Sequence, residues 1–563
     1  MAGNILTPSA IWKGFSVSST PSAEVIDVKK DGAVSFTRLY IDGKDTSDGK
    51  VRIFGVLAKP VAFTKGPAVL LLQDFEKTFD DKFIKTLASQ GYCVLAIDLY
   101  GKQERKEYFT EYPASIDYAN YVNAKQNIYA VEGDATATCW YQWACATRYA
   151  LKYLKDQPFV TCVGSLCYGQ SATAMWQVVG SEDDLKCSAF VLNAGWIGYR
   201  GIYKFSGKGE PQFTDEMYKF IAGIDPQAYA MHVNCPALVL SATGSNDFDC
   251  DRAWDTLSRM ENSPFKTLHY SVGDRVSVND QAYKNLELFF NKFLLVGGAD
   301  KDKLPSEVDI SAELVDGKFV VTVKPEDGAV KSVDLYASEE IYLPAERCWQ
   351  KICGKKPNEN GEYIYEYSAY PNSGAVTFFA QVTYKNGFAI GSKIINKKYS
   401  AEEVSFTNKS KILYSSRYAC AESIFAVGDD GQTMPIAVSD KAGVKTKKGP
   451  MGIEGVCCEN GLLTFKFKGV KDAPNDDAML MFDVYLKEEG QFVVKLIADY
   501  FGAKTEYFAV FKGVGGDVWH NVKFERNKFK TAEGMTLKDY TKINAVAFSA
   551  LGKEFLINNA LWV

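Results

Sequence analysis

The sequence predicts an α/β domain, a mostly parallel sheet with helices on both faces, followed by two β-sandwich domains. Three observations carry this prediction. Residues 1–295 alternate short apolar strands with amphipathic helices. A polar segment at 296–307, which contains Gly and Pro, ends that alternation. Beyond it the chain consists of short alternating strands separated by turn residues.

The first domain alternates strands and helices, as a sheet with helices on both faces does. Its short apolar strands, typical of buried parallel sheets, are expected at Val51–Leu57, Ala68–Gln73, Cys93–Asp98, Val160–Gly164, Ala189–Asn193, Ala237–Ala242 and Thr267–Val272. Helices with one apolar face are expected at Asp80–Gln90, Thr136–Lys155, Gln170–Val179 and Asp280–Leu294. The stretch 194–227, rich in Gly, Tyr and Phe, interrupts the alternation where a cap over a pocket would be inserted. We assign 1–297 to this domain and expect it to fold by itself.

Two β regions follow the linker. Segments such as ISAELVDGKFVVTVKP and GEYIYEYSAYP alternate between turn signals within 305–402, which predicts a fibronectin- or immunoglobulin-like β-sandwich. A second set of alternating strands fills 405–563, and it is expected to form a sandwich of its own.

Composition narrows the function classes. The chain has 563 residues, a net charge of −5 and no stripe of Lys or Arg, which argues against nucleic acid and anionic membranes as partners. No apolar run approaches the roughly 20 residues that span a bilayer. Thirteen scattered cysteines indicate buried free thiols and a cytoplasmic protein, although a secreted chain that has lost its signal peptide is the alternative. With three histidines and no C-x-x-C motif, neither a metal nor another cofactor is expected.

The strongest signal for chemistry is the segment 161–172, in which an apolar strand runs through a small-x-nucleophile-x-Gly pattern into a helix. Cys167 is its central residue, and Ser165 and Gly169 are the small residues that the tight turn requires. The helix N-terminus would lower the pKa of the Cys167 thiol, and the backbone N–H of Tyr168 would serve as an oxyanion donor. The alternative is that Cys167 is one more buried apolar residue.

The segment GSLCYGQ resembles the cysteine elbow of dienelactone hydrolases, and the wider domain is similar to the acetyl xylan esterase and PhoPQ-regulated branches of the same α/β-hydrolase fold. The resemblance covers about 60–295 and implies an α/β-hydrolase fold with a cysteine nucleophile. It implies a catalytic acid after the strand 237–242, where Asp247 stands in the matching position and Asp249 is the second choice. A carboxylate there would orient a histidine and stabilise its charged form.

The resemblance also implies a histidine between the last strand and the last helix of the domain, but this chain has none there. Arg275 stands closest to that position, and an arginine does not act as a general base near neutral pH. Among the three histidines of the chain, His232 precedes its strand, His520 belongs to the C-terminal region and His269 lies inside a strand. His269 is the alternative base, and a buried core histidine is the simpler interpretation.

The oxyanion segment departs from the resemblance as well, because the family often carries His-Gly after the strand that begins at Ala68. This chain has Gln73, Asp74 and Phe75 there, so a backbone N–H of Asp74 or Phe75 would contribute. An acidic side chain at that point opposes the stabilisation of a developing negative charge. Trp196, in the expected cap, is assigned to the wall of the pocket.

The two β regions resemble appended modules of known kinds. Residues 305–402 are similar to the small β domain of PhoPQ-regulated proteins, which implies a structural or docking role. Residues 405–563 resemble a jelly-roll carbohydrate-binding module, in which sugars stack on exposed aromatic rings. Tyr500, Phe501 and Tyr507 are the candidates for that contact.

Two functions from different classes follow. The first is an ester or thioester hydrolase with Cys167 as nucleophile, Asp247 as acid and Arg275 near both, acting on a small-molecule or carbohydrate ester. The second is a catalytically degenerate relative that keeps the pocket and binds a glycan or a small molecule. The elbow pattern favours the first, and the missing histidine together with the altered oxyanion segment favours the second.

Overall fold

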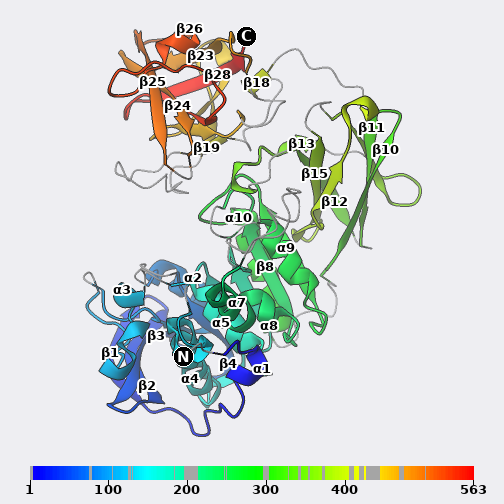
Figure 1. The fold of residues 1–563 in the computed structure, drawn as a ribbon. Coiled ribbons are helices and arrows are strands. Elements are labelled where there is room, and N and C mark those ends of the chain that lie inside the picture. The colour runs from blue at the N-terminus through cyan, green and yellow to red at the C-terminus, as the bar shows by residue number, and fades with distance from the viewer. Residues whose placement is uncertain are drawn as a thin grey trace. The chain divides into compact units, whose positions relative to one another are not determined.

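Figure 1 shows a computed structural model of the chain. It describes residues 4–74, 79–103, 106–124, 128–129, 131–182, 184–195, 213–245, 248, 250–295, 304–326, 329–339, 344–352, 356–369, 374–404, 411–416, 424–426, 444–467, 474–500 and 503–563. The chain divides into two compact units. The first comprises Met1–Ser241, Asp247–His269 and Asp280–Ser306, and the second comprises Ala242–Asn246, Tyr270–Asn279 and Glu307–Val563.

One sheet of nine strands runs through the N-terminal half of the described chain, in the order β1-β2-β3-β5-β4-β6-β7-β8-β9. The strands are β1 (Ala23–Asp31), β2 (Val34–Asp45), β3 (Lys50–Pro60), β4 (Gly66–Leu72), β5 (Cys93–Ile97), β6 (Val160–Tyr168), β7 (Ser188–Val191), β8 (Ala237–Ala242) and β9 (Lys266–Ser271). β1, β2, β3 and β5 pair antiparallel in that order, whereas β5, β4, β6, β7 and β8 pair parallel. Strands β5 and β8 are buried along their whole length, as parallel strands covered on both faces are.

The helices connect these strands. They are α1 (Pro8–Ile11), α2 (Asp81–Ser89), α3 (Tyr121–Ala124), α4 (Cys139–Lys155), α5 (Ser171–Val179), α7 (Asp215–Gly223), α8 (Pro226–Ala230), α9 (Cys250–Ser258) and α10 (Asp280–Phe293). Side-chain caps fix where two of them start, because Asp80 accepts a hydrogen bond from the backbone of α2 and Thr138 one from that of α4. The parallel sheet with connecting helices is confirmed, and the position of β5 between β3 and β4 gives the α/β-hydrolase strand order.

Two features of this half differ from the expectation. The hairpin of β1 and β2 was not expected, because most residues of β1 are exposed and charged and show no clean alternation. Strand β6 was expected to end at Gly164, but it continues through Tyr168. Half of the expected cap (194–227), residues 196–212, lies outside the described residues, and its described C-terminal part contains α7.

The first β region contains two antiparallel sheets. Within the described residues, one sheet has the order β10-β11-β14, and the other has the order β13-β12-β15-β16 with β17 paired to β15. The bounds are β10 (Val308–Val315), β11 (Lys318–Pro325), β12 (Val330–Glu339), β13 (Gln350–Ile352), β14 (Tyr363–Tyr367), β15 (Ala375–Tyr384), β16 (Ala389–Gly391) and β17 (Ile395–Lys398). The ring of Phe319 on β11 lies 5.8 Å from that of Phe378 on β15, so apolar side chains of both sheets share one core.

The C-terminal β region also contains two antiparallel sheets among its described residues (Figure 1, orange and red). One has the order β20-β21-β28-β23-β26 with β18 paired to β28, and the other has the order β19-β22-β27-β24-β25. The bounds are β18 (Lys411–Tyr414), β19 (Ile424–Ala426), β20 (Lys445–Lys448), β21 (Glu454–Cys457), β22 (Leu462–Thr464), β23 (Leu480–Leu486), β24 (Gly490–Ala498), β25 (Thr505–Gly513), β26 (Trp519–Phe524), β27 (Ile543–Ser549) and β28 (Phe555–Trp562). Phe482 on β23 lies between the two sheets, with its ring 5.6 Å from Phe492 and 5.7 Å from Phe548.

No helix in the described ranges is long and apolar enough to cross a membrane.

Candidate functional site

The turn between β6 and α5 is the point where an α/β-hydrolase carries its nucleophile. That fold places the nucleophile on a sharp, strained strand-to-helix turn, and the backbone N–H of the next residue helps to form the oxyanion hole. In this chain the residue with a left-handed backbone is Gly169, with φ +52°. It follows the last residue of β6 and precedes α5 by one residue. The elbow position is therefore Gly169, which has no side chain.

Cys167 lies two residues earlier, inside β6. It pairs in register with Leu72 on β4 and with Phe190 on β7. Its side chain is 0% exposed, and the thiol donates a hydrogen bond to the carbonyl oxygen of Ala189 at 3.4 Å. Burial raises the pKa of the Cys167 thiol well above its usual range. The prediction of an exposed, activated Cys167 is wrong, because the strand runs past it before the chain turns.

Tyr168 was expected to supply the oxyanion N–H. It is the last residue of β6 and pairs with Val191, so it belongs to the sheet and not to the turn. The N–H that follows the elbow residue is that of Gln170, whose side-chain amide donates to the hydroxyl of Tyr129 at 2.6 Å. The N–H in the position of an oxyanion donor is therefore that of Gln170 and not that of Tyr168.

Asp74 fills the space above the elbow. The backbone N–H of Gln170 donates to Oδ1 of Asp74 at 3.0 Å. A Cβ atom added at Gly169 would lie 2.4 Å from the carboxyl carbon and from both carboxylate oxygens of Asp74. A carboxylate thus lies where a nucleophile side chain would begin, and it accepts the hydrogen bond that would otherwise stabilise an oxyanion.

Neighbouring hydrogen bonds hold this arrangement in place. The hydroxyl of Ser171 bonds to the hydroxyl of Tyr100 and to the backbone carbonyl of Gln73. The side chain of Gln73 accepts a hydrogen bond from the backbone N–H of Asp80 at 3.0 Å. Burial, followed by the nearby charge of Asp74, raises the pKa of Tyr100 well above its usual range, so its phenol stays protonated. Sequence reasoning had placed Gln73 and Asp74 near the turn, and both lie there.

No histidine lies at the turn. His269 is inside β9 and fully buried. His232 precedes β8, whereas the turn follows the carboxyl end of a strand parallel to β7 and β8. His520 lies on β26 in the C-terminal sheets, with Nε2 2.9 Å from the carbonyl oxygen of Val514. Because the whole sequence holds three histidines, the elbow lacks an imidazole base.

Arg275 has a different role from the one expected. It lies in the second unit, where its guanidinium donates to the carbonyl oxygen of Ala345 at 3.0 Å and lies 4.6 Å from the ring centroid of Phe465. Burial lowers its pKa to about 10, and the charges of Tyr500 and Glu346 oppose that shift. These contacts bind Arg275 to β-region residues, and its expected pairing with Asp247 stays a prediction, because Asp247 lies outside the described residues. The remaining predicted residues, Asp247, Asp249, Phe75 and Trp196, lie outside the described residues.

Two further expectations concern metal ligands and aromatic rings on which sugars would stack. In the described part of the chain, no three His, Cys, Asp or Glu side chains are grouped as metal ligands would be. Tyr500 is fully buried, with its ring 5.0 Å from Phe465, so the expectation of an exposed stacking ring is wrong there. Tyr507 is partly buried against the core of the C-terminal sheets, and Phe501 lies outside the described residues.

The sequence contained a signal for Gly169. Cys167-Tyr168-Gly169-Gln170-Ser171 fits the same small-x-centre-x-small pattern, shifted by two residues. A glycine at its centre supplies no reactive group, so reasoning from chemistry favoured the cysteine. Backbone geometry alone separates the two alignments.

Comparison with known proteins gives no family for this chain. No family model matches it, and no curated protein does. Solved structures that resemble part of it include an acetyl xylan esterase from Paenibacillus sp. R4, with a TM-score of 0.39, 13% identity and coverage of 51% of this chain and 92% of that one. Acetyl xylan esterase 1 from Thermoanaerobacterium sp. JW/SL YS485 has a TM-score of 0.35 and 14% identity over 48% of this chain and 88% of that one. The glucuronoyl esterase from Solibacter usitatus has a TM-score of 0.34 and 13% identity over 50% and 89%.

Proposed function

We propose that this chain is a catalytically silent protein of α/β-hydrolase fold that binds a small molecule. One observation carries the proposal: the strained residue of the elbow is Gly169, and the carboxylate of Asp74 occupies the space beside it. A nucleophile needs a side chain at that residue. An oxyanion needs the backbone N–H of Gln170, which already donates its hydrogen bond to Asp74.

The missing groups are a general base and an oxyanion donor, and both lower the barrier to forming the tetrahedral intermediate. General-base catalysis contributes about 10² to 10⁴ in rate, and a single oxyanion donor about 10² to 10³. Cys167 does not compensate, because its buried thiol is held in the protonated form and the thiolate is the nucleophilic form.

Binding is supported by a separate feature of the first unit. A cavity of about 350 Å³ opens among β1, β2 and β3. Its size lies within the range that small-molecule pockets occupy, about 300 to 1,000 Å³. The first unit thus offers room for a ligand.

The proposal is tested by ester turnover. We expect the full chain to hydrolyse p-nitrophenyl acetate and p-nitrophenyl butyrate no faster than buffer, and Cys167→Ala to behave identically. Turnover by the wild-type protein that is lost in Cys167→Ala would overturn the silent site. Turnover that survives Cys167→Ala but is lost in Asp74→Asn would overturn it as well, since it would assign a catalytic role to Asp74.

A further inference from the structure

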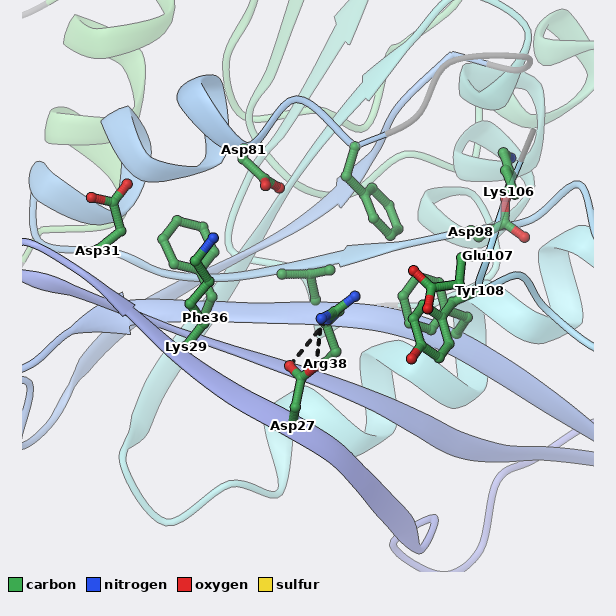
Figure 2. A pocket seen from close by; sticks show the side chains of 13 residues that line it. Asp27, Lys29, Asp31, Phe36, Arg38, Asp81, Asp98, Lys106, Glu107 and Tyr108 are labelled. Atoms are coloured by element: carbon green, nitrogen blue, oxygen red, sulfur yellow. Dashed lines mark hydrogen bonds and ion pairs between the residues drawn. The ribbon is translucent and has the colours of Figure 1, made fainter.

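The cavity of the first unit has two kinds of wall (Figure 2). Its base is apolar, with Phe36, Phe54 and Val56 all at least nine-tenths buried. Phe79 and Tyr108 extend this base, with ring centroids 5.6 and 5.5 Å from that of Phe54. Ligand pockets usually combine such an apolar lining with a few polar groups that set orientation and specificity.

The charged lining is predominantly acidic. Five carboxylates and three cationic side chains line the cavity. Three of the carboxylates are already paired. Asp27 binds Arg38 with Oδ1 3.0 Å from Nε, Asp98 binds Lys106 at 2.8 Å, and Asp31 binds Lys85 at 2.7 Å. The lining carboxylates outside these pairs are Asp81 and Glu107, and the lining cation outside them is Lys29. Among the described residues, Asp81 forms no ion pair, and Figure 2 shows it across the cavity from the Arg38–Asp27 pair.

The protein itself places a cation on this aromatic surface. The guanidinium carbon of Arg38 lies 5.0 Å from the ring centroid of Tyr108. A cation within about 6 Å of an aromatic centroid is attracted by the negative face of the ring. The hydrogen bond to Asp27 is the largest cause that raises the pKa of Arg38. Burial lowers this pKa, and the charges of Asp27, Tyr108 and Glu107 raise it. The field in this part of the cavity therefore favours positive charge.

The wall that carries Tyr108 is held from behind. The carboxylate of Asp98 accepts hydrogen bonds from the backbone N–H groups of Thr110 at 2.8 Å and of Gly101 at 3.2 Å. Asp98 also binds Lys106, with both side chains nearly inaccessible to solvent. A preformed wall lowers the entropic cost of binding, because fewer side chains have to be ordered when a ligand enters.

We propose that this cavity binds a small organic cation, an ammonium group on an apolar body. The apolar body packs on Phe54 and Phe79, and the ammonium lies near the carboxylate of Asp81. The inference names the ligand class for the binding role proposed above. It does not depend on the state of the elbow, so ester turnover would overturn the silent site and leave this ligand class standing.

The test uses isothermal titration of the full chain with 2-phenylethylamine and with two probes of similar shape, 2-phenylethanol and 3-phenylpropionate. We expect the amine to bind with a dissociation constant below about 1 mM. We expect both other probes to bind at least about tenfold more weakly, since they lack the positive charge that the acidic lining attracts. Equal binding of the alcohol, tighter binding of the carboxylate, or no saturable binding of the amine would overturn the proposal.

Two variants and a matched control locate the site. Asp81 is exposed in the first turn of α2, whose capping residue is Asp80, so Asp81→Asn preserves the fold. We expect this variant to weaken amine binding about fivefold, with the effect decreasing at high salt. Tyr108→Leu should weaken it about threefold, because the ring of Tyr108 stacks on Phe54 and extends the aromatic base on which the apolar body packs. Asp45→Asn, an exposed aspartate at the end of β2 outside the cavity, should leave binding unchanged, and an equal effect of this control would overturn the assignment.

Discussion

At the scale of single residues, one backbone angle decides what the elbow can do. Gly169 adopts φ +52°, a conformation that costs other residues strain, and Asp74 lies against its Cα. A side chain at position 169 would collide with this carboxylate. Asp74 and Gly169 therefore depend on each other, because the carboxylate fits only where the elbow residue has no Cβ.

This dependence predicts a coupling between the two residues. Gly169→Ala should lower the free energy of unfolding by about 2 to 4 kcal/mol, through left-handed strain and the contact with Asp74. Combining it with Asp74→Gly should recover part of that loss, since the strain remains while the contact is removed. A double-mutant cycle from urea unfolding measures the coupling. Additive effects of the two substitutions would show that the carboxylate does not fill the space at position 169.

At the scale of elements, the sequence predicts which segments form the sheet better than it predicts where each strand ends. Apart from the end of β6, the ends of the expected strands and of α5 lie within three residues of the observed ones, because apolar periodicity reflects burial directly. The end of β6 differs from the expectation because a turn centred on Cys167 requires the strand to end at Gly164. Its actual constraint is packing: a Cβ there would lie 3.0 Å from the methyl groups of Leu294 and 3.1 Å from the sulfur of Cys187. Such a long-range contact leaves no mark on the local pattern.

The same reason limits what could be predicted of the site. Order along the chain brought Gln73 and Asp74 to the elbow, since β4 and β6 are parallel neighbours. The contact between Asp74 and Gly169 depends on where the strand ends. Because β6 runs four residues further than expected, the elbow lies two residues further along the chain, and the apparent nucleophile Cys167 is a buried strand residue. Backbone conformation, which composition does not encode, decided the chemistry.

The extended β6 predicts the order in which thiols react. Cys162 is partly exposed near the start of the strand, whereas Cys167 is fully buried. At pH 8 iodoacetamide should label Cys162 first, because it reacts with thiolate and burial raises the pKa of Cys167. Raising the pH increases the thiolate fraction of any thiol, so labelling of Cys167 should remain the slower of the two up to pH values near its raised pKa. Mass spectrometry reads the order, protein unfolded in urea serves as the control, and faster native labelling of Cys167 would contradict the assignment.

At the scale of the whole molecule, the segment Tyr270–Asn279, for which the resemblance implies a catalytic role, groups with the β regions. Residues 270–279 belong to the second unit. The hydroxyl of Tyr270 donates to the carbonyl oxygen of Ser392 at 3.1 Å, and its ring lies 4.6 Å from that of Phe379. A Cβ at Gly391 would lie 2.4 Å from the Tyr270 ring, so this glycine permits the contact. Tyr270 thus has partners beyond residue 297, and the independent folding of 1–297 stays a prediction.

Arg275 gives the sharpest test of this role. If it stood in for a catalytic histidine, Arg275→His would raise ester turnover by supplying an imidazole. Its contacts with Ala345 and Phe465 predict the opposite: turnover stays at the buffer rate, and the free energy of unfolding falls by about 1 to 3 kcal/mol as a buried hydrogen bond and a stacked guanidinium are lost. Arg259→His is the matched control, because that arginine is half exposed in a surface pair with Asp255 and should change stability by less than about 0.5 kcal/mol. Urea unfolding and p-nitrophenyl acetate turnover of the three proteins separate the alternatives: a stable Arg275→His variant with raised turnover would return this loop to catalysis, whereas a destabilised variant without turnover would assign it to the packing of the second unit.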